Sequence, residues 1–388
     1  MSTFVKIFRV VKRNRIWPLC LLFVLLIALS AWKGLYSDVR QIKNYHGDDF
    51  FTSPNARIDS NRNIFNADKS RGTRIMVFAR KRSGSSVTGS YIGKNPDFFY
   101  FYEPGRIVSK HIAGIGGENF EFLEKIRPQL LSFLDGIYSC NFTGHEYFIS
   151  DMNETPLYRN KGAYPLKAPL SINDVTQYCL SKKHIVTKVL RLYNLLLATP
   201  LLQKHDVKVI HLVRDPRGLV KSREMFEATS KSTATEGELH LNDRLEGELV
   251  DYCRWMETNY LQALNAPSWL RTNYMLVRYE DIAARPEEVV PELYEFIGVS
   301  AKLFIKNAIQ TTSNLKPGNG EAWRNGVTFE NVQKMQALCP ERIWKMFGYR
   351  LVNSIELLRD SNTSLVEDMP ARDKSYFEEI YFNKVYGK

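Results

Sequence analysis

The stretch Arg74-Ile-Met-Val-Phe-Ala79, followed by Arg80-Lys-Arg-Ser-Gly-Ser-Ser-Val-Thr-Gly89, decides the fold class of this 388-residue chain. Its first six residues form a short apolar run bounded by charge, which predicts a buried strand. A Ser/Gly turn follows and leads into a predicted helix that begins near Ser86. Strand, turn and helix in this order predict a phosphate-binding turn, because Gly84 permits close backbone approach and the helix presents its positive end.

This turn differs from a nucleoside-triphosphate P-loop. A Walker A motif requires Lys and then Ser or Thr after its second Gly, whereas here Ser90 follows Gly89 directly. Arg82 places a cation where an anion would lie. Taken alone, the turn also fits a basic, solvated loop without a ligand.

Similar patterns recur along the chain. Val207-Lys-Val-Ile-His-Leu-Val213 and Tyr274-Met-Leu-Val-Arg278 predict two further strands, and residues 186–197 and 286–297 predict helices, the second ended by Gly298. Strands that alternate with helices predict an α/β fold with a central parallel sheet covered on both faces.

The second predicted strand also ends in candidate ligand residues. Asp215 is a favourable N-cap and Pro216 suits the first helical turn, so Arg214 is expected at the carboxyl edge of the sheet, where open α/β folds bind ligands. Ser222 follows nearly two helical turns after the cap and faces the same side. Arg214 and Ser222 can therefore bind one phosphate. A catalytic acid is the alternative role for Asp215, and the cap is favoured.

Composition and charge narrow the class of partner. The chain has 53 Lys and Arg against 42 Asp and Glu, a net charge of +11, which favours an anionic partner. The proportions of residues exclude a disordered, collagen-like or disulfide-miniprotein chain. Dispersed basic residues argue against nucleic acid, and no Cys/His cluster has the spacing of a zinc site, so no metal is required.

The amino-terminal segment predicts a membrane anchor. Residues 16–32 carry no charge, and five cations but no acid precede them, which predicts a single-pass type II topology with a luminal body. A cleaved signal peptide is the alternative. We expect a cytoplasmic tail at 1–15, the anchor at 16–32, a stem at 33–70, the luminal domain at 71–352, and a tail of no assigned role at 353–388. The short apolar span suits early secretory membranes, and the Golgi is the expected address.

The cysteines agree with an oxidising compartment. Four cysteines follow the anchor and allow three pairings, among which we favour Cys140 with Cys179 and Cys253 with Cys339. Buried free thiols are the alternative. Sequons at Asn141, Asn153 and Asn362 predict a glycoprotein.

At this point the motifs carry a family resemblance. Arg82-Ser-Gly-Ser-Ser86 and Arg214-Asp-Pro-Arg-Gly-Leu-Val-Lys-Ser222 resemble the 5′-phosphosulfate and 3′-phosphate motifs of Golgi carbohydrate sulfotransferases, in particular those that sulfate Gal, GalNAc or GlcNAc at O-6. Tyr102-Glu-Pro104, Arg278-Tyr-Glu-Asp281 and Ala322-Trp-Arg324 are also similar, in the family's order. The resemblance runs from about residue 74 to residue 349.

The resemblance implies sulfuryl transfer from 3′-phosphoadenosine 5′-phosphosulfate (PAPS) to a glycan or glycosaminoglycan, on a P-loop-like three-layer fold. It implies one set of residues for the 5′-phosphosulfate and one for the 3′-phosphate: Arg82, Ser83, Gly84, Ser85 and Ser86 in the first, Arg214 and Ser222 in the second. The segment Gly318-Asn-Gly-Glu-Ala-Trp-Arg-Asn325 resembles a loop that closes over the 3′-phosphate, which adds Trp323 and Arg324.

Catalysis needs charge stabilisation and a base. Arg82 is expected to stabilise charge on the transferring group, and Glu103 is expected to act as the base, with a pKa raised by burial beside the aromatic run Phe98-Phe-Tyr-Phe-Tyr102. His111 is the reserve candidate for the base. Lys188 and Arg191 are expected either to bind sulfate oxygens or an acidic acceptor, or to form a cationic helix face.

Two other functions fit part of the sequence. A luminal nucleotide-dependent kinase would use the same phosphate turn, but the chain lacks the Walker A lysine and a convincing carboxylate pair for Mg²⁺. A non-catalytic, membrane-anchored binder of acidic glycans would need only the positive charge. The sequence leaves a homo-oligomer open.

Overall fold

A computed structural model of the chain describes residues 72–114, 119–155, 169–230, 239, 241–300, 302–312 and 319–369. The chain divides into two units, and every described residue belongs to the second, Asp68–Lys388. The predicted tail, anchor and stem therefore lie outside the described residues. Within the described ranges, no helix is both long and apolar enough to cross a bilayer.

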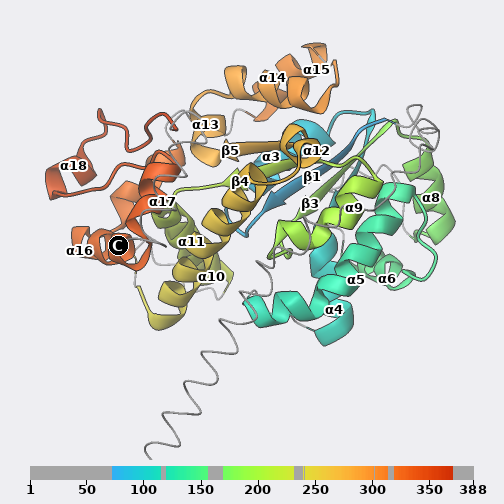
Figure 1. Ribbon diagram of the computed structural model, residues 1–388, viewed down its shortest axis with the longest axis horizontal. Coiled ribbons are helices and arrows are strands. Elements are labelled where there is room, and N and C mark those ends of the chain that lie inside the picture. Colours follow the sequence, from blue (N-terminus) through green and yellow to red (C-terminus); the bar gives the residue numbers. More distant parts are fainter. Residues whose placement is uncertain are drawn as a thin grey trace, which may run out of the picture. The chain divides into compact units, whose positions relative to one another are not determined.

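A five-stranded sheet forms the centre of the described unit (Figure 1). All its pairings are parallel, and the strands are adjacent in the order β2-β3-β1-β4-β5. The strands are β1 (Arg74–Ala79), β2 (Phe98–Tyr102), β3 (His184–Val189), β4 (Lys208–Val213) and β5 (Tyr274–Arg278). The predicted α/β class with a central parallel sheet is confirmed.

Helices occupy most of the chain between and after the strands. In chain order they are α3 (Ser85–Gly93), α4 (Pro104–Ala113), α5 (Phe120–Ser139), α6 (Tyr147–Glu154), α8 (Ile172–Leu180), η2 (Leu195–Ala198), α9 (Thr199–Lys204), α10 (Pro216–Ser230), α11 (Asp243–Leu264), α12 (Ser268–Thr272), α13 (Tyr279–Ala284), α14 (Pro286–Ile297), α15 (Lys302–Thr312), η3 (Asn319–Gly326), α16 (Phe329–Leu338), α17 (Glu341–Met346) and α18 (Ile355–Arg359).

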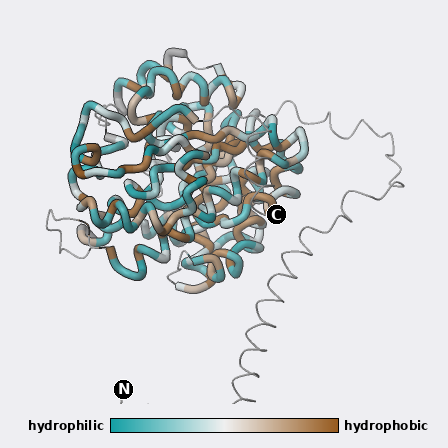
Figure 2. The backbone as a smooth tube through the Cα atoms, turned by 60° about the vertical axis from the view of Figure 1, so that its left-hand side comes forward, coloured by the Kyte–Doolittle hydropathy of each residue, from teal (hydrophilic) through white to brown (hydrophobic). Residues whose placement is uncertain are grey.

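Strand β2 shows how the sheet is covered on both faces. Phe101 packs edge-on against Phe133 of α5, whereas Tyr100, the preceding residue of β2, lies against Gly89 and Gly93 of α3. Successive side chains of a strand point to opposite faces, so α5 and α3 cover opposite sides of the sheet. Figure 2 shows apolar and polar stretches alternating along the helices and strands of the body. Every residue of β2 is buried, which explains its unbroken aromatic sequence.

Most predicted elements are confirmed, and one is wrong. The strands at 74–79 and 274–278 and the helix at 286–297 have the predicted bounds, and the strand predicted from 207 begins at Lys208. Residues 186–197, predicted as a helix, instead complete β3 and then form η2. β3 pairs with both β1 and β2, so sheet hydrogen bonding on two sides outweighs the helical spacing of its apolar residues.

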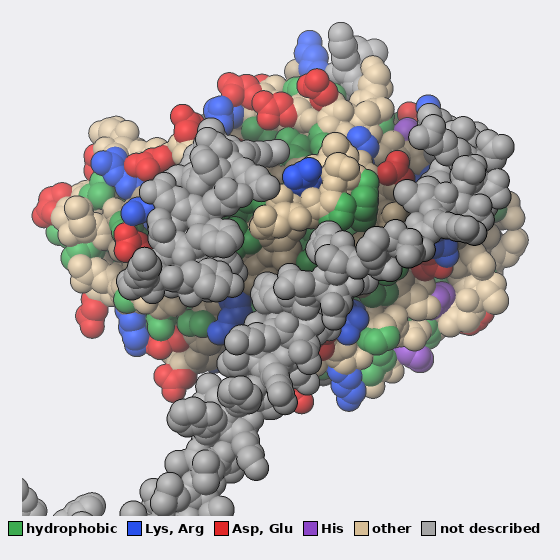
Figure 3. All heavy atoms as spheres, viewed as in Figure 1, with side chains coloured by type: hydrophobic (Ala, Val, Ile, Leu, Met, Phe, Trp, Pro, Cys, Tyr) green, Lys and Arg blue, Asp and Glu red, His purple; other side chains and the backbone are tan. Residues whose placement is uncertain are grey.

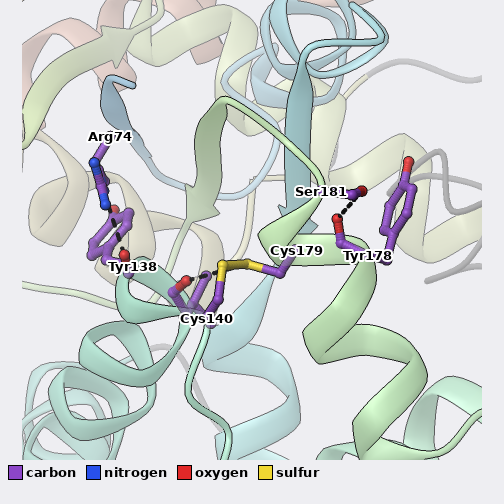
Figure 4. The surroundings of a disulfide bond; sticks show 7 residues. Arg74, Tyr138, Cys140, Tyr178, Cys179 and Ser181 are labelled. Carbon is purple, nitrogen blue, oxygen red and sulfur yellow. Dashed lines mark hydrogen bonds between the residues drawn. A yellow bond between two sulfur atoms is a disulfide. The ribbon is translucent and has the colours of Figure 1, made fainter. Parts of the chain in front are cut away.

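Two disulfide bonds join distant parts of the chain. Cys140, at the end of α5, bonds to Cys179 of α8 (Figure 4), and Cys253 of α11 bonds to Cys339, which follows α16. Both predicted pairings are confirmed. Each bridge ties helices that pack around the sheet.

The folded body continues past residue 352, where the predicted domain ended. Leu358 of α18 and Leu365 are completely buried, and Tyr349 forms a β-bridge with Val366. The predicted tail at 353–388 therefore begins with an integral part of the body, through residue 369.

Candidate active site

The turn between β1 and α3 has the form of a phosphate-binding turn. Gly84 adopts φ +90°, and a Cβ there would meet the ring of Tyr279 at 2.1 Å, so only glycine fits. Helix geometry leaves the amides of Ser85 and Ser86 without partners inside α3. Ser83 differs from the expectation, because its buried hydroxyl donates to the Arg80 carbonyl at 2.7 Å and thereby closes the turn.

The turn between β4 and α10 is held by a buried ion pair. The Asp215 carboxylate accepts from the Arg217 amide at 2.8 Å and from the Arg217 guanidinium at 2.6 Å. Both side chains are almost completely buried. The predicted capping role of Asp215 is confirmed, and its saturation by Arg217 argues against the alternative role as a catalytic acid.

These two turns meet at one edge of the sheet. Arg82 Nε donates to Ser222 Oγ at 3.0 Å, and Arg214 Nη1 donates to the Arg82 carbonyl at 3.0 Å. The Arg214 guanidinium also lies over the Tyr279 ring, 4.6 Å from its centre. Burial and the proximity of Arg214 lower the pKa of Arg82, as expected for two cations held together. The structure therefore brings both predicted phosphate-binding motifs to one place.

Two donors without partners lie around Gly218 of α10. A Cβ at this glycine would lie 3.3 Å from Arg214 Nε and 3.3 Å from Trp323 Nε1. Both N–H groups are buried and lack a hydrogen-bond partner among the described residues. A buried donor without a partner costs about 1–3 kcal/mol, so this corner favours an anion that can accept from both. The structure thus places Trp323 beside Arg214.

Arg324 does not join this site. Its guanidinium donates to the carbonyls of Leu357, Leu358, Asp360 and Thr363 at 2.6–3.0 Å. The side chain is buried and points into the segment after residue 353. The expectation that Arg324 binds the 3′-phosphate is therefore corrected: the arginine holds the chain's carboxyl-terminal part.

Glu103 lies at a third turn, between β2 and α4. Its carboxylate is 13% exposed, pairs with Lys188 Nζ at 2.8 Å and lies 3.9 Å from Arg191. Burial alone raises the pKa of Glu103, but the opposing charges and the hydrogen bond from Lys188 lower it more, so the net shift is downward. The predicted rise in the pKa of Glu103 is wrong, because the sequence did not reveal that Lys188 and Arg191 flank the carboxylate.

Lys188 connects the third turn to the first. Its ammonium donates to Ser86 Oγ at 3.0 Å as well as to Glu103, and it lies 4.1 Å from the centre of the Tyr102 ring. Lys188 belongs to strand β3 and is almost fully buried. The expected cationic helix face is therefore excluded for Lys188.

Arg82 and Glu103, the two candidate catalytic residues, both have a strained backbone conformation. Arg82 has φ +72° and Glu103 has φ +51°, and only four residues other than glycine have positive φ in the described part of the chain. A side chain in this region costs of order 1 kcal/mol, and such strain clusters at functional sites. Both residues predicted to act in catalysis are held in this conformation.

His111, the reserve base, lies elsewhere. Its exposed ring stacks on Tyr147 of α6 with centroids 4.1 Å apart. It follows Glu103 by eight residues along α4, about 12 Å at the helical rise. His111 therefore belongs to the surface between α4 and α6.

Two residues of the motif Arg278-Tyr-Glu-Asp281 lie at the site, although the sequence assigned no role to either. Tyr279 packs against Gly84 and Arg214, and Glu280 accepts from the Asp215 amide at 3.0 Å and from the Tyr349 hydroxyl at 3.0 Å. Burial and the charge of Asp215 raise the pKa of Glu280 to about 7. The signal was their place directly after the predicted strand at 274–278, at the carboxyl edge of the sheet.

A separate cavity of about 210 Å³ lies between α13, η3 and residues 364–368. Its lining contains five carboxylates and two arginines, a balance that does not suit an anionic ligand. In the described ranges, no group of His, Cys, Asp and Glu has the arrangement of a metal site.

Comparison with known proteins identifies the family to which this parallel α/β fold belongs. The sulfotransferase domain family model matches residues 72–347, so the chain belongs to that family. It is similar to carbohydrate sulfotransferase 3 of Tetronarce californica, with 28% identity over 76% of each chain. It is also 28% identical to carbohydrate sulfotransferase 1 of Danio rerio, over 78% of this chain and 84% of that protein.

Proposed function

We propose that this protein transfers a sulfuryl group from PAPS to a sugar hydroxyl, at O-6 of Gal, GalNAc or GlcNAc in a glycan or glycosaminoglycan. The observation that carries the proposal is the convergence of Arg82, Ser222 and Arg214 at the edge of a parallel sheet. Membership of the sulfotransferase family and the carbohydrate sulfotransferases among its relatives support a sugar acceptor.

The binding site for PAPS is assigned from two kinds of group: cations, and N–H groups that lack a hydrogen-bond partner among the described residues. Arg82 and the free amides at the start of α3 bind the 5′-phosphosulfate, because they place a cation and N–H groups on one anion. Arg214, Ser222 and the Trp323 indole N–H bind the 3′-phosphate, which gives the two orphaned donors an acceptor. PAPS supplies the sulfuryl group when bound.

The reaction breaks the bond between sulfur and the bridging oxygen of the phosphosulfate and forms a bond between sulfur and the sugar oxygen. Glu103 accepts the proton of the sugar hydroxyl, and 3′-phosphoadenosine 5′-phosphate (PAP) leaves. Arg82 stabilises the negative charge that grows on the bridging oxygen. Lys188 keeps Glu103 ionised and orients it through the shared contact with Ser86.

The proposed location is the Golgi membrane, with a type II anchor at 16–32 and the body in the lumen. The uncharged segment with its basic flank supports this topology, and two disulfides support an oxidising compartment. Basic and acidic side chains are interspersed on the face in Figure 3, which does not favour general electrostatic capture of a glycan.

The test is transfer of label from radiolabelled PAPS to a panel of glycans by the full-length chain. Arg82→Ala should lower the rate about 10³-fold, in the range for losing a transition-state donor. Arg127→Gln, which breaks only an ion pair with Glu124 on α5, is the matched control. Transfer of phosphate from ATP without use of PAPS would favour a kinase, and glycan retention without transfer would favour a non-catalytic binder.

A further inference from the structure

We propose that residues 354–368, here called the C-terminal strap, position Trp323 for the 3′-phosphate of the donor and thereby set how well the protein distinguishes nucleotides that carry this group. The inference rests on the proposed function. The strap itself contributes no group to the donor site; it acts through η3, which lies between the strap and helix α10.

The first link joins the strap to the middle of η3. Arg324, next to Trp323, donates to the carbonyls of Leu357, Asp360 and Thr363, and Arg359 donates back to the Arg324 carbonyl. Hydrogen bonds from a charged donor are about twice as strong as neutral ones. The guanidinium of Arg324 therefore fixes the backbone that carries the indole.

Further links hold both ends of η3. The Glu321 carboxylate accepts from the Leu365 amide at 2.7 Å and from Ser364 Oγ at 2.8 Å. Arg359 Nη2 donates to the carbonyl of Val327, just after η3, at 2.9 Å. The complete burial of Leu365 anchors the strap on the body, so these polar contacts have a fixed base.

The second link joins η3 to the donor site. The Trp323 ring lies against Gly218 and 4.9 Å from the Arg217 guanidinium, both on α10. Gly320 of η3 packs against Glu280, where a Cβ would meet the backbone at 3.1 Å. Tight contacts at both ends leave η3 little freedom once the strap is in place. The position of the indole N–H beside Arg214 therefore depends on the contacts of the strap with η3 as well as on those of η3 with α10.

This arrangement predicts a selective effect on binding. PAP carries the 3′-phosphate and 5′-AMP lacks it, while the rest of the nucleotide is shared. Loosening the strap should weaken the binding of PAP and leave the binding of 5′-AMP unchanged. A general loss of structure would weaken both nucleotides, so the ratio of the two dissociation constants separates positioning from stability.

The experiment measures the Kd of PAP and of 5′-AMP by calorimetry on the full-length chain. Arg359→Gln removes two contacts from an exposed side chain and should raise the Kd of PAP about fivefold, or ~1 kcal/mol, with less than about twofold change for 5′-AMP. Arg324→Gln should have a larger effect in the same direction. Arg127→Gln on α5, far from α18 in Figure 1, is the control.

The outcomes separate the two proposals. If the wild-type chain does not prefer PAP to 5′-AMP, the proposed function fails. If it prefers PAP and Arg359→Gln keeps the wild-type ratio, or weakens both nucleotides equally, the role of the strap is overturned. Should Arg324→Gln fail to fold, Arg359→Gln decides alone.

Discussion

Two glutamates at the carboxyl edge of the sheet have pKa values that are shifted in opposite directions. Glu103, after β2, lies beside Lys188 and Arg191, and its pKa is lowered. Glu280, after β5, lies beside Asp215 and Tyr349, and burial raises its pKa to about 7. Burial raises the pKa of both carboxylates and is the largest cause at each. The cations Lys188 and Arg191 reverse that rise at Glu103, whereas Asp215 adds to it at Glu280.

The comparison also separates their roles. Glu103 is partly exposed and ionised, so its carboxylate can accept a proton from a substrate, and its lowered pKa makes it a weaker base than an ordinary glutamate. Glu280 is buried within the body and hydrogen-bonds the turn that precedes α10. We therefore expect changes at Glu103 to alter catalysis and changes at Glu280 to alter stability.

Replacement of the proposed base is the most severe test of this division. Glu103→Gln keeps the shape and removes the proton acceptor, so kcat should fall about 10³-fold, within the range for general-base catalysis. The measurement is the initial rate of label transfer at saturating PAPS. Glu124→Gln, on α5, is the matched control. A Glu103→Gln variant with wild-type turnover would assign the base elsewhere.

The raised pKa of Glu280 predicts a pH-dependent stability. A carboxyl whose folded pKa is near 7 and whose ordinary value is 4.5 stabilises the fold fully below pH 4.5 and loses that contribution as pH rises through 7. The free energy of unfolding of the wild type, relative to Glu280→Gln, should fall by about 3 kcal/mol over this window. Urea unfolding at pH 4.5 and pH 8 measures it. An equal difference at both values would contradict the buried carboxyl described above.

Arg214 links the donor site to Glu280. Its charge lowers the pKa of Glu280, and its guanidinium is a proposed ligand of the 3′-phosphate. Arg214→Ala should raise the Kd of PAP about 30-fold, or ~2 kcal/mol, and change that of 5′-AMP much less. Calorimetry with both nucleotides checks this. An equal loss for the two would place Arg214 outside the 3′-phosphate site.

The smallest expected effect concerns the pH dependence of the rate. Because the pKa of Glu103 lies below its ordinary value of 4.5, its carboxylate stays ionised from pH 5.5 to pH 7.5. The kcat at saturating PAPS should then vary less than about twofold over this range. A steep loss of kcat below pH 7 that is absent from Glu103→Gln would show that Lys188 does not keep the Glu103 carboxylate ionised during turnover.

The strand and turn segments at the donor site could be predicted because their signals are local. Ala79 ends an apolar run, Gly84 begins a helix, and Asp215 precedes Pro216, and each of these patterns needs only its sequence neighbours. The parallel direction of the strands then follows from their alternation with helices. The helix predicted at residues 186–189 was wrong for the opposite reason, because pairing with two neighbouring strands outweighs the helical spacing of their apolar residues.

The sequence by itself determined the α/β class and the strand-turn-helix form of the two turns, because propensity and capping act over a few residues, whereas it left three cysteine pairings open. Only the tertiary structure decided that Lys188 lowers the pKa of Glu103 and that Arg324 binds the strap. It also placed the N–H groups of Trp323 and Arg214 beside Gly218, without hydrogen-bond partners among the described residues. The residues in each of these contacts are about 30 to 110 positions apart in the chain. Charge and hydrogen bonding follow distance in space, which no local pattern encodes.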